Sequence, residues 1–488
     1  MELYISEFSK YVIPLLMVFY TLDCFLVFCH DNEEKRSGSY TRQNIYMFAI
    51  HFSCFMVICF ETGEITYLFF YAFQQIVLYA AIVLFRMLYP KANRLLINNM
   101  CLLLSISFVI LTRLDLNKAI RQFIIVTGSL VVAFLIPFFV HKFKFLKNLQ
   151  WIYAMVGIAA LSVVLILGQT TYGSKISYSI AGITFQPSEF VKILFVFFVA
   201  SALYKSSGFF EVFTTAVIAA IHVAVLVLSK DLGSALIFFV VYVLMVYVAS
   251  KNILYIGAGL LGGSAAAYIA YSVFTHVQVR VQAWKDPWSV IDAEGYQITQ
   301  SLFAISSGGW FGLGLFKGTP DDIPLVEADF IFSAIAEEMG IIFSVCLILV
   351  CVSCFIMFMR ISAELKDKFY QLTAFGLGVT YIFQVFLTIG GGTKFIPLTG
   401  VTLPLISYGG SSVLTTLIMF SIVEGLCIIR LDEEEERRAK AKARKRKKKK
   451  IRRMLEDLDE EGQQEILEEL THNENFVKKE NMSLWDEE

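Results

Sequence analysis

The sequence predicts an all-α polytopic membrane protein, and three observations lead to that fold class. The chain of 488 residues is 57% hydrophobic and 17% charged, whereas soluble domains are about 45–50% apolar and about 25% charged. Its mean hydropathy is +0.65. Thirteen apolar stretches reach or approach the roughly 17–25 residues that cross a bilayer. Backbone polar groups in lipid must be satisfied internally, so these stretches are predicted to be helices.

The predicted helices follow one another along most of the chain. Two segments between them are long and polar, at 168–188 and at 275–329. A loop as long as the second one is usually functional or disordered. Its tryptophans and glycines are not typical of a disordered linker, so we expect it to fold onto the outer face. The predicted helices span 11–29, 45–61, 65–86, 97–112, 122–140, 151–168, 189–205, 212–229, 233–250, 253–274, 330–358, 370–390 and 405–429.

Lysine and arginine are concentrated in alternate loops, and this pattern predicts the orientation of the chain. It places the N-terminus outside and the C-terminus in the cytoplasm, with the basic block from Arg437 to Arg453 inside. Arg113, Lys118 and Arg121 lie together in one predicted outside loop, where this rule predicts few basic residues. Because the basic block directly follows a membrane helix, we expect it to bind anionic lipid head groups, at about 1 kcal/mol per basic residue, and no nucleic acid.

Four acidic residues flank a short apolar run in "LVEADFIFSAIAEEMG", residues 325–340, at the start of a predicted membrane helix. An Asp before an apolar run is a favoured helix cap, which is one explanation of Asp329. Capping does not explain Glu337 and Glu338, which lie about two turns further along the helix. Ionisable groups at membrane depth are costly and are usually functional. Asp329 is therefore either a cap or a group that meets a substrate at the membrane boundary.

The loop 275–329 carries polar side chains that suit a phosphorylated sugar. Arg280, Lys285 and Lys317 are candidate phosphate ligands. Gln297 and Gln300 are candidate hydrogen-bond partners of a sugar. The glycines of the loop allow the backbone to approach a ligand closely. The structural alternative is a glycine-rich re-entrant turn with aromatic anchors at the membrane interface.

The segment "FQPSEFVKI", residues 185–193, has the features of a helix start. Pro187 fits the first turn, and Glu189 is favourable near the N-terminus of a helix. Lys192 follows three residues later on the same face. Glu189 and Lys192 are therefore either a local ion pair or part of a site in which Lys192 meets a pyrophosphate.

The segment "FIPLTGVTLPLISYGGSS", residues 395–412, interrupts an otherwise apolar region with prolines and glycines. Non-helical backbone at membrane depth is tolerated only where protein buries it or where it lines a cavity. We therefore expect this segment to border a cavity or to be packed inside the protein.

Five ordered motifs together resemble the SEDS family of bacterial cell-wall proteins, which includes RodA, FtsW and SpoVE. The resemblance covers roughly residues 95–430. The matches are Gln186 to Lys192 with Q-P-S/A-E-x-x-K, Asp231 to Leu236 with D-L-G-T/S-A-L, Asp286 to Gly309 with D-P-W…G-Y-Q…Q-S…A-I-x-S-G-G, Asp329 to Gly340 with D-F-I-F…E-E-x-G, and Pro397 to Ser412 with P-x-T-G-x-x-L-P-x-I-S-Y-G-G-S-S.

The resemblance implies a chain with three parts. The family core has ten helices with both ends cytoplasmic, and ten predicted stretches from about residue 97 match it. Three further transmembrane helices would form an N-terminal module over 1–94. The core with its large outer loop 275–329 would occupy 95–430, and a charged cytoplasmic tail would occupy 431–488. Because the core begins in the cytoplasm, three added membrane crossings place the N-terminus outside, in agreement with the distribution of basic residues.

The resemblance also implies an activity. Family members are peptidoglycan glycosyltransferases that polymerise lipid II on the outer face of the cytoplasmic membrane, beside a class B penicillin-binding transpeptidase. Asp329 matches the essential acid and would be the general base for the acceptor hydroxyl, while undecaprenyl pyrophosphate leaves. Lys192, Arg280 or a divalent cation, Mg²⁺ or Mn²⁺, would stabilise the leaving group; no metal site is assigned. The other candidate substrate-binding residues are Glu189, Gln297, Gln300, Glu338, Ser407 and Tyr408.

The chain departs from the family pattern at three places. Thr388 stands where the family often has Asn, and Ser229 and Lys230 precede Asp231 in place of Gln-Pro. The sequence "IPLVEAD" replaces L-P-E-x-x-T-D. None of these changes removes the candidate base Asp329. The form "GTPDDIPLVEADFIF" is nearer to RodA-like elongation proteins than to FtsW-like division proteins.

Two other functions are compatible with a polytopic protein of this kind. A lipid II flippase or transporter would line a pathway through the helices with the same acids and Lys192. A non-catalytic scaffold would only dock a penicillin-binding protein. Most charges cluster on the predicted outer side and the acid Asp329 is present, which favours surface chemistry over both alternatives.

Overall fold

A computed structural model describes residues 2–30, 32–171, 174–180 and 183–456. The chain divides into two compact units, Met1–Arg430 and Leu431–Glu488. The last helix, α15 (Gly410–Glu456), begins in the first unit and ends in the second. In the second unit, Glu434 pairs with Arg438 and Glu436 pairs with Lys440, both at helical spacing. Residues 457–488 of the predicted tail lie outside the described residues.

The structure has a helix at each of the thirteen predicted stretches. Twelve of the described helices are long and apolar enough to cross a membrane, which confirms the all-helical polytopic class. The thirteenth is α7 (Pro187–Leu203), which has 17 residues and packs against α6, α9 and α14. The others are α1 (Glu2–Cys29), α2 (Glu33–Thr62), α3 (Thr66–Leu88), α4 (Arg94–Leu114), α5 (Leu116–Lys142), α6 (Gln150–Leu167), α8 (Phe209–Leu228), α9 (Leu232–Ser250), α10 (Leu254–Val273), α13 (Ile331–Glu364), α14 (Lys368–Gly392) and α15.

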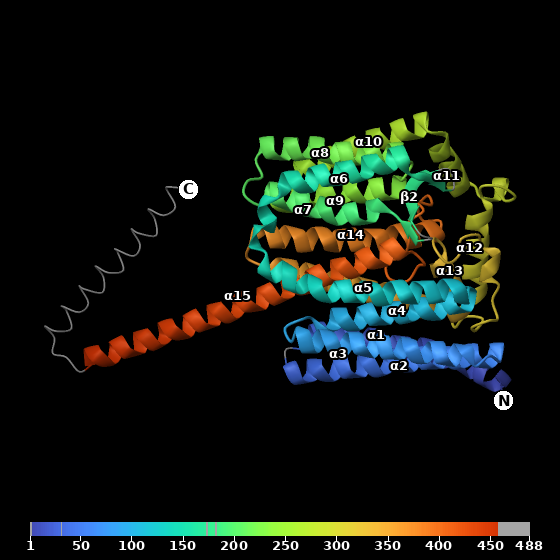
Figure 1. The fold of residues 1–488 in the computed structure, drawn as a ribbon, viewed down its shortest axis with the longest axis horizontal. Helices are drawn as coiled ribbons and strands as arrows, with labels where there is room; N and C mark the ends of the chain where they lie inside the picture. The colour runs from blue at the N-terminus through green and yellow to red at the C-terminus, as the bar shows by residue number, and fades with distance from the viewer. Residues whose placement is uncertain (1, 31, 172–173, 181–182, 457–488) are drawn as a thin grey trace. The chain divides into compact units, whose positions relative to one another are not determined.

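Both long polar segments have regular structure of their own. The loop 275–329 contains α11 (Thr275–Lys285) and α12 (Tyr296–Gly308), with short 3₁₀ turns at Trp288–Val290 and Pro320–Asp322; another lies at Lys144–Asn148. The segment 168–188 forms an antiparallel sheet in the order β1 (Gln169–Thr171), β2 (Ser174–Ile180) and β3 (Ile183–Phe185). The sequence did not predict these strands. Figure 1 shows α11, α12 and β2 together at one end of the helices of the first unit.

The three N-terminal helices cover α4, the first helix of the region that carries the motifs (Figure 1). Every residue in the most apolar stretch of α4 is buried. Buried polar side chains join these elements: the Tyr20 hydroxyl donates to Asn99 Oδ1 at 2.9 Å, and Asn99 Nδ2 donates to Ser353 Oγ at 2.8 Å. Asn98 Nδ2 donates to Gln43 Oε1 at 2.9 Å. Because unpaired polar groups are costly in such an environment, these bonds fix how α1 and α2 pack against α4 and α13.

The helix α13 is broken at Gly340, whose φ of 83° no helical residue adopts. The loop after α12 fills the break with backbone hydrogen bonds: Leu313 N–H donates to the Glu337 carbonyl and Gly314 N–H donates to the Glu338 carbonyl, both at 2.9 Å. In return, the N–H of Ile341 donates to a loop carbonyl. The break separates the short helix that carries the acids from the apolar span that follows, and ties both to the loop.

Replacing Gly340 with alanine should disrupt this junction. A Cβ atom there would lie 2.3 Å from the Gly312 nitrogen and 2.5 Å from the Phe311 carbonyl carbon, in a left-handed backbone conformation. We expect a loss of about 2–4 kcal/mol from overpacking and backbone strain, measured as a lower melting temperature of the purified protein.

Gly128→Ala is the matched control, because Gly128 lies inside α5 and an added Cβ meets nothing within 4 Å. Alanine inside a helix should be neutral or stabilising by about 0.5–1 kcal/mol. Equal melting temperatures for Gly340→Ala and Gly128→Ala would contradict the proposed role of the break.

Candidate active site

A cavity of about 370 Å³ lies where α11, α12, the start of α9 and the segment 396–400 meet. Its charged lining residues are Lys230, Asp231, Arg280, Glu294 and Asp329. Gln297 also lines it, so three of the residues predicted from sequence, Asp329, Arg280 and Gln297, come together here. Trp284 and apolar side chains make up most of the rest of the wall.

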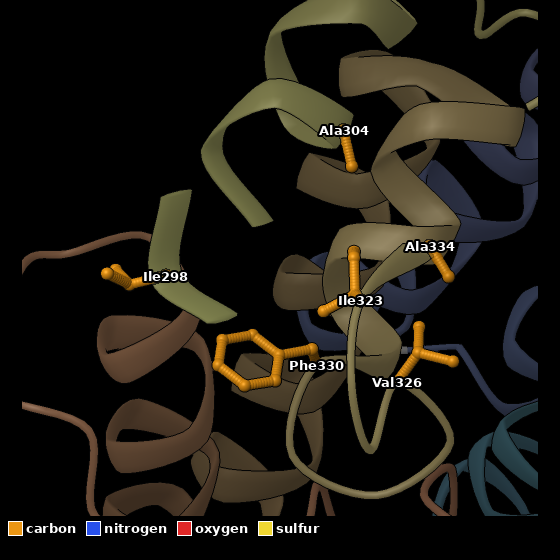
Figure 2. Packing of buried hydrophobic residues seen from close by; sticks show 6 residues of the cluster. All are labelled: Ile298, Ala304, Ile323, Val326, Phe330 and Ala334. Carbon is orange, nitrogen blue, oxygen red and sulfur yellow. The ribbon is translucent and has the colours of Figure 1, made fainter. Parts of the chain in front are cut away.

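Asp329 is held in place by the residue that follows it. Phe330 is only 1% exposed and packs with Ile298 of α12 and with the loop residues Ile323 and Val326. Figure 2 shows the Phe330 ring in this cluster, to which α12, the loop and α13 all contribute. Burying a large aromatic side chain next to Asp329 fixes the backbone from which the carboxylate extends into the cavity.

The segment 403–409 holds the two residues before Asp329. Ser407 Oγ donates to the Ala328 carbonyl at 2.5 Å, and the Tyr408 N–H donates to the Glu327 carbonyl at 2.8 Å. Lys118 pairs with the Glu327 carboxylate at 2.5 Å. Ser407 and Tyr408 were predicted to bind substrate; the structure places them behind Asp329, where they orient its backbone. Substrate contact by either residue stays a prediction.

The carboxylate of Asp329 does not cap α13. The N-cap position is Phe330, and it has no side-chain capping hydrogen bond. Within the described part of the chain, no residue makes a hydrogen bond to the Asp329 carboxylate. The capping alternative is therefore wrong, and the oxygens of this carboxylate remain available to a ligand in the cavity.

Burial and a nearby cation act on Asp329 in opposite directions. Burial raises the pKa of Asp329 to about 6, and the guanidinium of Arg280 opposes that rise. Both side chains lie beside Gly400, whose φ is 70°: a Cβ there would be 3.8 Å from Asp329 Oδ2 and 4.0 Å from Arg280 Nη2. Arg280 is itself positioned by the carbonyls of Leu398 and Thr399, each 3.4 Å from Nη1. The site thus combines a carboxyl that titrates near neutral pH with a fixed positive charge.

Asp231 and Lys230 complete the charged lining, and neither was predicted as a site residue. Asp231 accepts hydrogen bonds from the hydroxyls of Ser188 and Ser234, at 2.9 Å and 2.8 Å, and from the Ser234 N–H at the start of α9. Lys230 lies in the turn between α8 and α9, in a left-handed conformation with φ of 62°. The signal that could have identified Asp231 was its position at the start of the D-L-G motif.

Glu189 and Lys192 lie away from this cavity, in a buried network. Lys192 Nζ donates to Glu189 Oε2 and to Gln384 Oε1, both at 2.6 Å, and Thr415 Oγ1 donates to Glu189 Oε2 at 3.1 Å. Gln384 in turn donates to the Thr402 carbonyl at 3.0 Å. The spacing of Glu189 and Lys192 thus produces the local ion pair predicted as one alternative, and this pair supports the segment that leads to the cavity wall. Direct substrate binding by either residue stays a prediction.

Glu338 is also paired inside the protein. Arg113 Nε donates to Glu338 Oε1 at 2.9 Å, and the same guanidinium binds Asp321 at 3.1 Å and the Gly318 carbonyl at 3.2 Å. This pairing explains why a basic residue occurs in a loop predicted to be outside. Glu338 therefore anchors the loop to α13, and its predicted contact with substrate stays a prediction. Gln300 lies one turn beyond Gln297 on α12 and lines a second cavity.

The residues that the structure describes include no group of three or more His, Cys, Asp or Glu side chains that could hold a metal ion. Asp329 and Asp231 line the same cavity, but Arg280 is the cation that interacts with both of them. We therefore assign no residue to a divalent cation and derive no step through one.

Comparison with known proteins identifies the family. The model of the FtsW, RodA and SpoVE family, described as "Cell cycle protein", matches residues 87–429. The chain belongs to this family. The membership confirms the resemblance inferred from the five motifs. The match begins near the start of α4, so most of the sequence of α1 to α3 lies outside it.

Two relatives and one solved structure show how far the similarity extends. The peptidoglycan glycosyltransferase RodA of Mycobacterium tuberculosis (strain H37Rv) is 34% identical over 366 residues, which cover 68% of this chain and 77% of that protein. A probable peptidoglycan glycosyltransferase FtsW of Aliivibrio salmonicida is 32% identical and covers 57% of this chain and 71% of its own length. A chain from a peptidoglycan synthase complex has the same fold, with a TM-score of 0.60 and 23% identity over 70% of this chain and 98% of that one.

The raised pKa of Asp329 predicts how stability depends on pH. Because burial raises the pKa of Asp329 from its ordinary value of 3.8 to about 6, the stability that the protonated acid provides is lost as pH rises through that range. Asp329→Asn should therefore melt at the same or a higher temperature than wild type at pH 7.5, with a smaller difference at pH 4.5. Thermal unfolding at both pH values measures this.

Asp292→Asn, an exposed position in the same loop, controls for a general effect of replacing Asp with Asn. A wild-type protein more stable than Asp329→Asn at pH 7.5 would mean that the carboxylate is stabilised by contacts the structure does not contain.

Proposed function

We propose that this protein is a peptidoglycan glycosyltransferase that polymerises lipid II, with Asp329 as the general base. The observation that carries the proposal is the Asp329 carboxylate: it lines a cavity, has no hydrogen bond from the described residues, and has a pKa raised by burial to about 6. Family membership and the names of the RodA and FtsW relatives support the reaction class.

In the proposed reaction, Asp329 removes the proton from the 4-hydroxyl of the acceptor GlcNAc. The hydroxyl oxygen then bonds to the anomeric carbon of the donor MurNAc, and the bond from that carbon to the pyrophosphate oxygen breaks. The proton stays on Asp329 until water removes it. A general base works best when its pKa lies near the working pH, and a positioned base contributes about 10²–10⁴-fold to the rate.

Negative charge develops on the departing undecaprenyl pyrophosphate, and the cavity has cations to meet it. Arg280 is half-buried and fixed by two backbone carbonyls, so its charge is in place before the reaction begins. Lys230 adds a second positive charge to the same lining. Preorganised positive charge of this kind stabilises a transition state without reorganisation. Gln297, also in the lining, is suited to hydrogen-bond a sugar hydroxyl or acetamido group.

The proposal also assigns an orientation and partners. The alternation of basic loops supports an external N-terminus and a cytoplasmic C-terminus, so that the cavity faces outward. A class B penicillin-binding transpeptidase is the proposed protein partner, and the shared fold with one solved chain of a peptidoglycan synthase complex supports it. The 34% identity to RodA supports a RodA-like role in elongation. The three helices of 1–94 would brace the core of 95–430 through α4, and the basic tail would bind anionic lipids.

Asp329→Asn should abolish polymerisation. We expect glycan synthesis from lipid II by the purified protein, together with its transpeptidase, to fall by at least about 10²-fold, because the substitution removes the general base. Asp292→Asn should keep wild-type activity. A flippase would instead move lipid II across vesicle membranes without making glycan, and a scaffold would give the same glycan yield with Asp329→Asn as with wild type.

Arg280→Gln should change the pH dependence of the reaction. The positive charge of Arg280 favours the ionised form of Asp329, so its removal should raise the pKa of Asp329 above about 6. The acidic limb of the profile of rate against pH should then shift to higher pH, along with a lower maximal rate. An unshifted limb would show that Arg280 does not act on the base.

A further inference from the structure

A second cavity, of about 260 Å³, is lined by residues of α12, of the loop that follows it and of α13. The hydrophobic cluster of Figure 2 contributes to the walls of both cavities: Ile298 lines the first, whereas Ala304 and Ile323 line the second. The second cavity has polar lining from Gln300, Asp322 and Glu337, and none of these residues contributes to the first cavity.

The helix α12 connects the two cavities. Gln297 lines the first and Gln300 lines the second. Residues three apart lie on the same face of a helix, and the rise between them is about 4.5 Å. A chain of sugars that follows this face would therefore present successive units to Gln297 and then to Gln300.

Glu337 supplies an unsatisfied hydrogen-bond acceptor in the second cavity. The residue is only 4% exposed, and its Oε1 accepts the Thr319 N–H at 3.0 Å. Its Oε2 is buried without a hydrogen-bond partner in the described part of the chain. The next residue, Glu338, is held by Arg113. A buried acceptor without a donor is costly, so the site favours a ligand that brings a donor to Oε2.

The other lining residues restrict the chemistry of that ligand. Two carboxylates, Glu337 and Asp322, disfavour an anion. Lys317 lines the cavity but pairs with Glu61 of α2 at 2.9 Å, so its charge is already engaged. Phe303 is 48% exposed and lies 5.8 Å from the Trp288 ring, which gives the rim an aromatic surface. Neutral hydroxyl and amide donors next to an aromatic surface are the features of an acetamido sugar.

We propose that this second cavity binds a saccharide unit of the glycan strand next to the unit that reacts at Asp329. Glu337 Oε2 accepts a hydroxyl or acetamido N–H, Gln300 donates and accepts beside it, and Phe303 contacts the sugar ring. The proposal rests on the proposed glycosyltransferase function. Because Glu61 and Lys317 join α2 to the cavity wall, it also gives the added N-terminal helices a part in shaping the site.

Binding tests the proposal without requiring turnover. The probe is a neutral tetrasaccharide of β-1,4-linked GlcNAc, and its affinity for the purified full-length protein is measured by titration calorimetry. Wild type and Asp292→Asn, an exposed loop variant outside both cavity linings, should bind it equally. Glu337→Gln and Gln300→Ala should each bind it at least about fivefold more weakly. Ser306→Ala, an exposed position of α12 outside the cavity lining, is the matched control.

Several results would overturn the proposal. The first is that wild type does not bind the tetrasaccharide. The second is that wild type and the two cavity variants bind it with equal affinity. The third is that the free stem peptide, and not the sugar, binds in a way that depends on Glu337. Gln300→Ala removes a half-buried side chain without altering the Glu337 backbone, so it tests the site even where Glu337→Gln does not fold. Polymerisation by Asp329→Asn tests the proposed function, whereas tetrasaccharide binding by Gln300→Ala tests this site, so each proposal can fail without the other.

Discussion

The structure of the site depends on one constraint: the half-buried carboxylate of Asp329, just before α13, has no hydrogen bond from the described residues to stabilise its charge. Burial raises the pKa of Asp329, and the guanidinium of Arg280 limits that rise. The surrounding contacts serve to maintain this arrangement. Phe330 anchors the backbone in an apolar cluster, and Ser407 donates a hydrogen bond to the carbonyl before Asp329. A partner for the carboxylate would make the folded state more stable and the base weaker.

Buried polar contacts join the elements around the site in addition to the packing of their helices. The break at Gly340 lets the loop after α12 bond directly to the backbone of α13. Arg113 at the end of α4 ties the same loop to Glu338. Because α1 to α3 cover α4 and Glu61 of α2 reaches Lys317, the helices outside the family match support the loop that lines both cavities. The Lys192 network supports another part of the site: Lys192 binds Gln384, and Gln384 binds the carbonyl of Thr402, which follows the segment 396–400 of the cavity wall.

The sequence predicted the helices well because apolar length alone decides whether a segment can cross a membrane. The sequence identified Asp329 because this residue precedes a predicted membrane helix and begins the D-F-I-F motif. It predicted the pairing of Lys192 with Glu189 but not the contacts of Lys192 with Gln384 and of Glu338 with Arg113, since helical spacing reveals neighbours on one helix and not side chains that approach from another. The strands of 169–185 were missed because they are short and lie in a polar loop. The second cavity depends on the fold of the whole loop, which no local pattern in 275–329 encodes.

The most direct test of this account is the pKa of Asp329 itself. Infrared difference spectra of the purified protein, wild type minus Asp329→Asn, recorded between pH 3.5 and 8.5, isolate the carbonyl stretch of this one protonated carboxyl. We expect a band that disappears with a midpoint near pH 6, as burial without a hydrogen-bond donor requires. A midpoint near the value of about 3.9 for an exposed Asp would show that the carboxylate is solvated or paired, and would contradict the account.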